Sequence, residues 1–161
     1  MTSLASVAQR QATFSEEKHL GALNEPLVSS GTLRYRRPSY LEKVTQLPKP
    51  ERLVVDGDRL TVTDAAGAVK EIDLGNMPEV GAFVDLVRGT LAGDLGALQR
   101  HYRVAIEGTA RTWQLSLIPT EARLAGFIKL VRIDGEGTEP RTIDTIQANG
   151  DWSRMVIEPV H

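Results

Sequence analysis

The chain has 161 residues, 25% of them charged, and a formal net charge of −2 at pH 7. This length suits one domain over residues 1–161, whose folding buries roughly two-thirds of the unfolded chain's surface. The mildly acidic balance argues against a dedicated nucleic-acid binder, which carries a basic patch or stripe. The lack of cysteine excludes disulfides and thiolate chemistry. No run approaches the ~20 apolar residues of a spanning helix.

The N-terminal residues predict a short helix over 3–10, followed by an extended segment over 11–18. The end of this segment is polar, and we interpret the run Glu16–His19 as a solvated strand end. The first ten residues, MTSLASVAQR, have neither the charged region nor the apolar region of a signal peptide. A cytosolic start and a chain from which a signal was removed both remain open.

Turn sequences separate short apolar runs along most of the remaining chain. They are Asp56-Gly57, Asp64–Gly67, Asp134–Gly137 and Asn149-Gly150. Asp-Gly and Asn-Gly pairs favour hairpins because both residues tolerate the positive φ that such turns need. The spacing predicts about ten antiparallel strands in a meandering sheet rather than alternating strands and helices.

One segment has helical periodicity instead, within a helical insert over about 76–100. Asn76 and Glu79 have the spacing of a capping box, Pro78 suits the first turn, and residues 94–99 predict a second short helix. Glycines at 81 and 89 each cost about 1 kcal/mol relative to alanine, so the longer helix depends on what it packs against. The residues that recur on one face are Val80, Phe83, Val84, Val87 and Leu91.

Several strands have one apolar and one polar face, which indicates a sheet that is dry on one side. The fold class is therefore α+β: one curved antiparallel sheet forms an incomplete β-barrel, and short helices cover its apolar concave face. Two interpretations stay open, because the helices could fill the concavity as a core or enclose a hollow for a lipid. The residues expected to face the concavity are Leu33, Tyr35, Leu53, Val55, Leu60, Trp113, Leu115, Leu117 and Met155.

No arrangement of residues points to an enzyme, a metal site or a cofactor. The histidines at 19, 101 and 161 are isolated, and none has the spacing of a metal-binding pair. No Gly-x-Ser-x-Gly elbow is present, and the glycine-rich turns are acidic and do not precede a helix. We therefore expect a protein without catalytic activity.

Arg37 is unusual because the alternation of Leu33 and Tyr35 would turn its side chain toward the apolar face. It could lie at a strand end and extend into water, as long arginine side chains do. It could instead face the concavity and donate hydrogen bonds from its guanidinium to the covering helix. Alternation alone does not choose between the two.

The order of these segments resembles the bacterial outer-membrane lipoprotein carrier family, the LolA-like proteins. The resemblance implies an incomplete antiparallel barrel with lid helices, a periplasmic location and no enzymatic activity. It also implies that Arg37 latches the lid by hydrogen bonds to the helices. The similar segments are Phe14–Lys18, Pro26-Leu27, Ser29–Leu33, Arg37-Pro38, Pro48 with Pro50, and Asp56-Gly57 with Leu60.

On this basis we expect a monomeric periplasmic carrier that acts as a chaperone for acyl chains, with its signal peptide absent from this chain. Its partners would be an acylated lipoprotein or another acyl lipid, an inner-membrane donor and an outer-membrane acceptor. Leu60–Val62 stand where the family often has an aromatic, so the cargo could also be a pigment or glycolipid precursor. The alternative is a protein-interaction or sensory domain of the same fold with a filled core.

Overall fold

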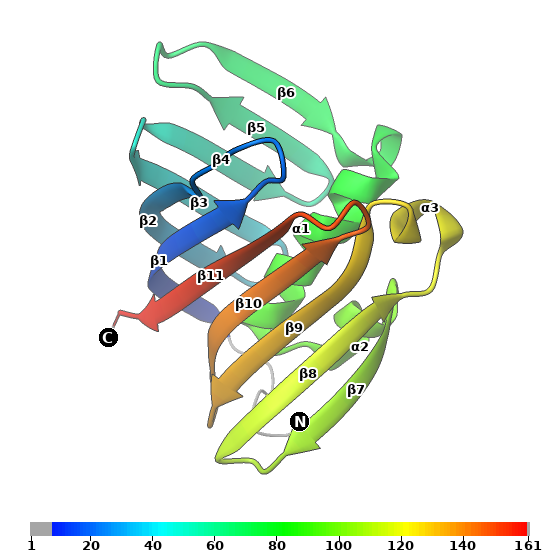
Figure 1. Cartoon of the computed structure of the whole chain (residues 1–161). Coiled ribbons are helices and arrows are strands. Elements are labelled where there is room, and N and C mark those ends of the chain that lie inside the picture. Colours follow the sequence, from blue (N-terminus) through cyan, green and yellow to red (C-terminus); the bar gives the residue numbers. More distant parts are fainter. Residues whose placement is uncertain (1–7, 161) are drawn as a thin grey trace.

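The computed structural model describes residues 8–160, except for the side chains of residues 78, 79 and 83. Eleven strands form one antiparallel sheet in the order β6-β5-β4-β3-β2-β1-β11-β10-β9-β8-β7 (Figure 1). The strands are β1 (Gln9–His19), β2 (Leu27–Arg36), β3 (Tyr40–Leu47), β4 (Glu51–Asp56), β5 (Arg59–Thr63), β6 (Val69–Asp73), β7 (Tyr102–Gly108), β8 (Thr112–Pro119), β9 (Ile128–Glu136), β10 (Glu139–Gln147) and β11 (Trp152–Pro159). The helices are η2 (Leu74–Asn76), α1 (Pro78–Ala92), α2 (Leu95–Gln99) and α3 (Ala122–Ala125).

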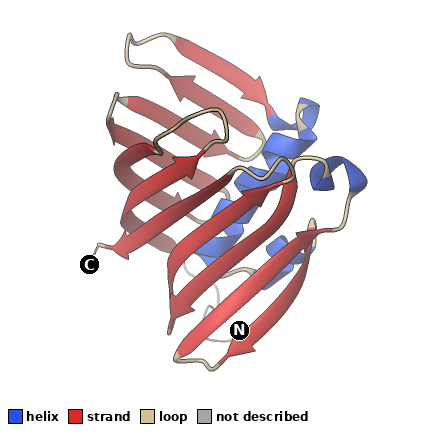
Figure 2. Cartoon of the chain, viewed as in Figure 1, coloured by secondary structure: helices blue, strands red, loops and turns tan. Residues whose placement is uncertain are grey.

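The sheet consists of two meanders, β1–β6 and β7–β11, in which consecutive strands pair. They join where β1 pairs with β11, so β6 and β7 are the two outer edges and the sheet does not close. The helical segment over 74–99 connects these edges and crosses the concave face between them (Figure 2). The curved, incomplete barrel with short covering helices is therefore confirmed.

The predicted turns are present at the expected glycines. Gly57, Gly67, Gly137 and Gly150 all have positive φ, between 57° and 93°. The third turn begins later than predicted, because β9 continues through Gly135 to Glu136. A Cβ at Gly135 would overlap the indole ring of Trp113, so this glycine allows close side-chain packing rather than a turn.

The helical insert matches its predicted boundaries but not its predicted cap. Helix α1 ends at Gly93, whose φ of 69° is left-handed, and Asp94 caps α2 by accepting a hydrogen bond from the backbone N–H of Ala97. The N-cap of α1 is Met77, with no side-chain cap, so the capping box expected from Asn76 is wrong. Asp73 caps the preceding turn η2 instead, which places Asn76 inside that turn.

The N-terminal prediction is partly wrong. Residues 1–7 of the expected helix lie outside the described residues, but Gln9 and Arg10 begin β1 and pair with Arg36 and Tyr35 of β2. The strand pairing provides partners for the backbone groups of these residues, so β1 starts before the predicted residue 11. The extended conformation over 11–18 is confirmed.

Candidate functional site

A cavity of about 470 Å³ lies on the concave side of the sheet, beneath the first part of α1. Apolar side chains from both the sheet and the helix form most of its wall. The sheet contributes Leu27, Leu33, Leu41, Leu53, Val55, Leu60, Trp152 and Met155, the helix contributes Val80, Val84 and Val87, and Leu20 completes the apolar part.

Five of the predicted concave residues line this cavity, namely Leu33, Leu53, Val55, Leu60 and Met155. Of the predicted lid residues, Val80, Val84 and Val87 line it from above. Leu91 belongs to the hydrophobic core, and the side chain of Phe83 lies outside the described part of the structure. Tyr35 lines a separate hollow beside Arg88 and Gly89.

The other end of the concave face is filled rather than hollow. Trp113, Leu115 and Leu117 belong to one core cluster with Leu86 of α1 and Leu98 of α2. The Trp113 indole N–H also donates a hydrogen bond of 2.9 Å to the Gly137 carbonyl, which fixes the ring. The concave face is therefore filled at the end of Trp113, Leu115 and Leu117 and hollow at the end of Leu53.

The cavity also has polar residues that the sequence did not indicate. Glu16 is only 6% exposed, and its Oε1 lies 3.7 Å from Nζ of Lys43 and 4.0 Å from Nζ of Lys18. The interpretation of 16–19 as a solvated strand end is therefore wrong for Glu16. Alternation with the buried Ala12 and Phe14 turns it inward, and this period of two was the available signal. The remaining polar lining residues are Thr145, Gln147 and Ser153.

Polar contacts fix the second half of α1 to the sheet. Arg10 of β1 donates from Nε to the Leu91 carbonyl at 2.9 Å, and from Nη2 to the Thr138 carbonyl at 2.9 Å. Burial lowers the pKa of Arg10, and the charge of Glu139 opposes this effect. A half-buried arginine on the concave face therefore does hold the helix, but it is Arg10 of β1 and not Arg37.

A second arginine holds α1 from the helix side. Arg88 donates from Nη1 to the carbonyls of Ser39 and Gly57, at 3.0 and 2.7 Å. Its Nη2 donates to Asp85 Oδ1 at 2.7 Å, and Asp85 Oδ2 lies 3.0 Å from His101 Nε2. These contacts all attach α1 between residues 85 and 91, whereas Val80 and Val84 cover the cavity from the part of the helix that precedes them and Val87 covers it from within the attached part.

Arg37 does not make the expected latch contact with any described residue. Strand β2 ends at Arg36, and Arg37 lies in the following turn with its side chain exposed. Its backbone N–H donates to the Ala8 carbonyl at 2.8 Å, but no hydrogen bond or ion pair joins its guanidinium to another side chain or carbonyl within residues 8–160. The alternation fails here because the strand ends one residue too early.

We predict that Arg10→Leu lowers the free energy of unfolding by about 2 kcal/mol, because it removes charge-assisted hydrogen bonds to two carbonyls. Amide hydrogen exchange in the second half of α1 should become faster. Arg37→Leu is the matched control and should change the unfolding free energy by less than about 0.5 kcal/mol. A larger effect on α1 from Arg37→Leu than from Arg10→Leu would restore Arg37 as the latch.

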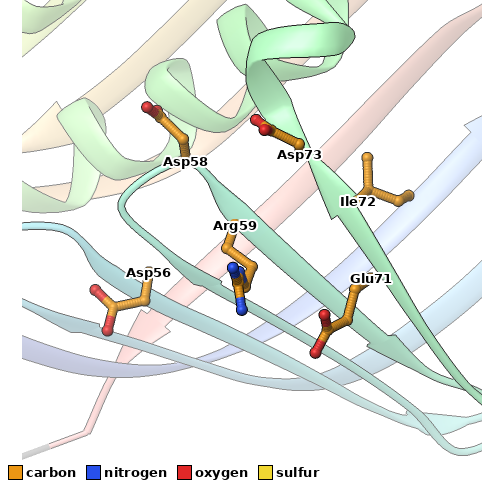
Figure 3. Close-up of a pocket in the computed structure, with 6 residues that line it drawn as sticks. All are labelled: Asp56, Asp58, Arg59, Glu71, Ile72 and Asp73. Atoms are coloured by element: carbon orange, nitrogen blue, oxygen red, sulfur yellow. The ribbon is translucent and has the colours of Figure 1, made fainter.

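A second hollow of about 410 Å³ lies outside the cavity, where β4, β5 and β6 meet their turns (Figure 3). Figure 3 shows Arg59 between Asp56 and Glu71. Asp56 accepts a hydrogen bond from the Ser39 hydroxyl, and Asp73 accepts one from the backbone of Gly75. These acidic groups organise local turns, so the concave cavity is the better candidate site.

The described helices are all too short or too polar to cross a membrane. Within residues 8–160, no cluster of three or more histidine or carboxylate side chains could hold a metal ion.

Comparison with solved structures finds similar folds at low sequence identity. A putative outer membrane lipoprotein-sorting protein domain from Vibrio parahaemolyticus matches with a TM-score of 0.50 and 11% identity, over 93% of this chain and 83% of that chain. A LolA superfamily protein from Nitrosomonas europaea has a TM-score of 0.46 and 8% identity, over 96% and 86% of the two chains. A DUF1329 family protein from Desulfovibrio piger has a TM-score of 0.48 and 12% identity, over 99% and 86%.

Among proteins of curated function, none matches this chain. A family description, in contrast, covers nearly all of it: residues 1–159 match the family described as outer membrane lipoprotein carrier protein LolA-like. The unclosed sheet of eleven strands, with its helices on the concave side, is similar in fold to the Vibrio domain. The chain therefore belongs to the LolA-like family.

Proposed function

We propose that this protein is a periplasmic carrier that binds the acyl chains of lipoproteins, or of a related lipid, and carries them toward the outer membrane. The observation that supports this most directly is the apolar cavity of about 470 Å³ under α1. Its volume falls in the usual range of ligand pockets, roughly 300–1,000 Å³. Each acyl methylene that leaves water contributes about 0.8 kcal/mol, so the chains supply most of the affinity.

Release of cargo requires the cavity to open, and the attachment of α1 indicates where. Residues 85–91 are held by Arg10, Arg88 and His101, whereas two of the three valines that cover the cavity, Val80 and Val84, lie in the first half of the helix. That first half also has no side-chain cap and contains Gly81, so its helical conformation is weakly supported. We propose that this first half moves away from the sheet while the second half stays attached.

In this proposal the protein works as a monomer by binding and release, without a catalytic step. An inner-membrane protein supplies the acylated cargo and an outer-membrane protein accepts it. The alkyl wall of leucine, valine and methionine recognises chain length and bulk rather than a particular lipid, because dispersion and burial have no directional requirement. Cargo identity is therefore determined elsewhere in the cavity or by the partners.

Native mass spectrometry of protein prepared without detergent tests the proposal. We expect mass additions that correspond to acyl species, or their appearance after incubation with phospholipid vesicles and with a palmitoylated peptide. A mass that stays that of the bare chain after both incubations would contradict the carrier and would favour a protein-interaction or sensory role.

A further inference from the structure

We propose that the polar end of the cavity is a subsite for the head group of an anionic acyl amphiphile whose head also carries a hydroxyl or N–H donor. This inference rests on the proposed acyl binding and adds the chemistry of the head group to it. It follows from three observations: a buried carboxylate oxygen without a donor, an excess of positive charge in the wall, and the separation of polar and apolar lining residues.

Glu16 provides the first observation. Glu16 lines the cavity, its Oε1 is buried, and no described group within residues 8–160 donates a hydrogen bond to that oxygen. The ammonium groups of Lys43 and Lys18, at 3.7 and 4.0 Å, neutralise its charge from beyond hydrogen-bonding distance. A buried acceptor without a donor is unfavourable, so this oxygen suits a donor that a ligand brings.

The charge of the wall provides the second observation. Glu16, Lys18 and Lys43 are the ionisable residues among the described ones that line the cavity, so two cations face one anion. The Lys43 side chain is 23% exposed, and its ammonium lies 5.1 Å from the centre of the Phe14 ring. An excess cation in a partly desolvated site attracts an anion more strongly than it does in water.

The strand register provides the third observation. Lys18 pairs with Ser153, and Ser153 pairs with Thr145, so polar lining residues adjoin across β1, β11 and β10. Across β3, β4 and β5 the row Leu41, Val55 and Leu60 is apolar. Lys43 of β3 pairs with Leu33 and Leu53, and its ammonium lies 3.7 Å from Glu16 Oε1, so it extends from this apolar part toward Glu16. A bound amphiphile therefore lies with its chain beneath α1 and its head near Glu16 and the lysines.

The test compares two lipids with the same chain, 1-palmitoyl lysophosphatidic acid and 1-palmitoylglycerol, by displacement of a fluorescent fatty acid from the whole protein. The phosphate of the first lipid should make it bind about tenfold more tightly than the neutral lipid. Lys43→Gln should bring this ratio close to one. Lys129→Gln, the same change at an exposed position of β9, should preserve the ratio.

The role of Glu16 is tested with a lysolipid that has the phosphate but no free hydroxyl. In the wild-type protein this lipid should bind several-fold more weakly than lysophosphatidic acid, whereas in Glu16→Met the two should bind equally. If removal of the lipid hydroxyl weakens binding by the same factor in the wild-type protein and in Glu16→Met, Glu16 does not accept a hydrogen bond from that hydroxyl and this part of the proposal is wrong. If Lys43→Gln fails to fold, as judged by circular dichroism, Lys18→Gln at the more exposed lysine replaces it and should also lower the ratio.

The outcomes separate the subsite from the carrier function. If neither palmitoyl lipid binds, the proposed acyl binding itself is wrong. If both bind with equal affinity, acyl binding stands and the head-group subsite is wrong. Inorganic phosphate alone should not displace the fluorescent fatty acid at the concentrations used for the lipid. Displacement by phosphate at those concentrations would show an anion site that needs no chain, which also overturns the proposal.

Discussion

Val84→Trp is expected to weaken acyl binding by at least about tenfold while the protein stays folded. Val84 reaches the cavity from the first half of α1, and an indole at this position would occupy space that an acyl chain needs. Displacing only two methylenes forfeits about 1.6 kcal/mol, at about 0.8 kcal/mol each, which corresponds to roughly tenfold in affinity. Titration with a fluorescent fatty acid measures the change.

The control is Val156→Trp, the same substitution at an exposed position on the convex face of β11. It should leave fatty-acid affinity within about twofold of the wild-type value. Thermal unfolding of both variants verifies that they are folded. Unchanged affinity in a folded Val84→Trp variant would show that acyl chains bind somewhere other than the cavity.

Leu115→Ala is expected to cost about 3–4 kcal/mol of unfolding free energy, whereas Leu53→Ala should cost about 1 kcal/mol. Both leucines lie on the dry side of the sheet. Leu115 is completely buried in the filled half, so its removal leaves a void and forfeits close contacts. Leu53 is half-buried beside an existing cavity, so its methyl groups have fewer partners to lose.

Urea denaturation measures the unfolding free energies of the two variants. The free energy should fall with urea concentration at the same slope as in the wild-type protein, so the extrapolated values can be compared directly. Saturating fatty acid should enlarge the difference in unfolding free energy between the wild-type protein and Leu53→Ala, because Leu53 also contacts the ligand in the proposed complex. Similar losses for both variants would contradict the division of the concave face into a filled and a hollow half.

The sequence predicted the fold well because its strongest signals are local. Glycines such as Gly57 and Gly93 adopt the positive φ that only a turn or a helix end requires, so they mark boundaries reliably. Alternation likewise identified the dry face of several strands, as the burial of Leu33 and Leu117 shows. These signals need no knowledge of what lies across the core.

The candidate site was harder to predict because it depends on the path of α1 over the sheet. Trp113 and Leu53 have the same alternating pattern, yet one lies in the filled core and the other lines the cavity. Glu16 is one of the alternate residues of β1 that face the interior. Because its side chain is charged and its neighbours are polar, the sequence predicted that it would face solvent. The opposite error occurred at Arg37. The alternation of β2 placed its side chain on the concave face, but the strand ends at Arg36, so the alternation does not apply to it.

The pairing of β1 with β11 has a consequence for how the protein folds. Every other strand pair joins consecutive strands, so each meander can assemble through contacts that are close in the chain. The β1–β11 pair instead brings together Phe14 and Ile157 from opposite ends of the described chain, which carries a larger loop-closure cost. Glu16 and Met155 face the cavity from either side of this pair, so the cavity exists only once it has formed. Until this pair forms, the apolar faces of the two half-sheets stay exposed and prone to aggregation, so a factor that shields them would act before this step of folding.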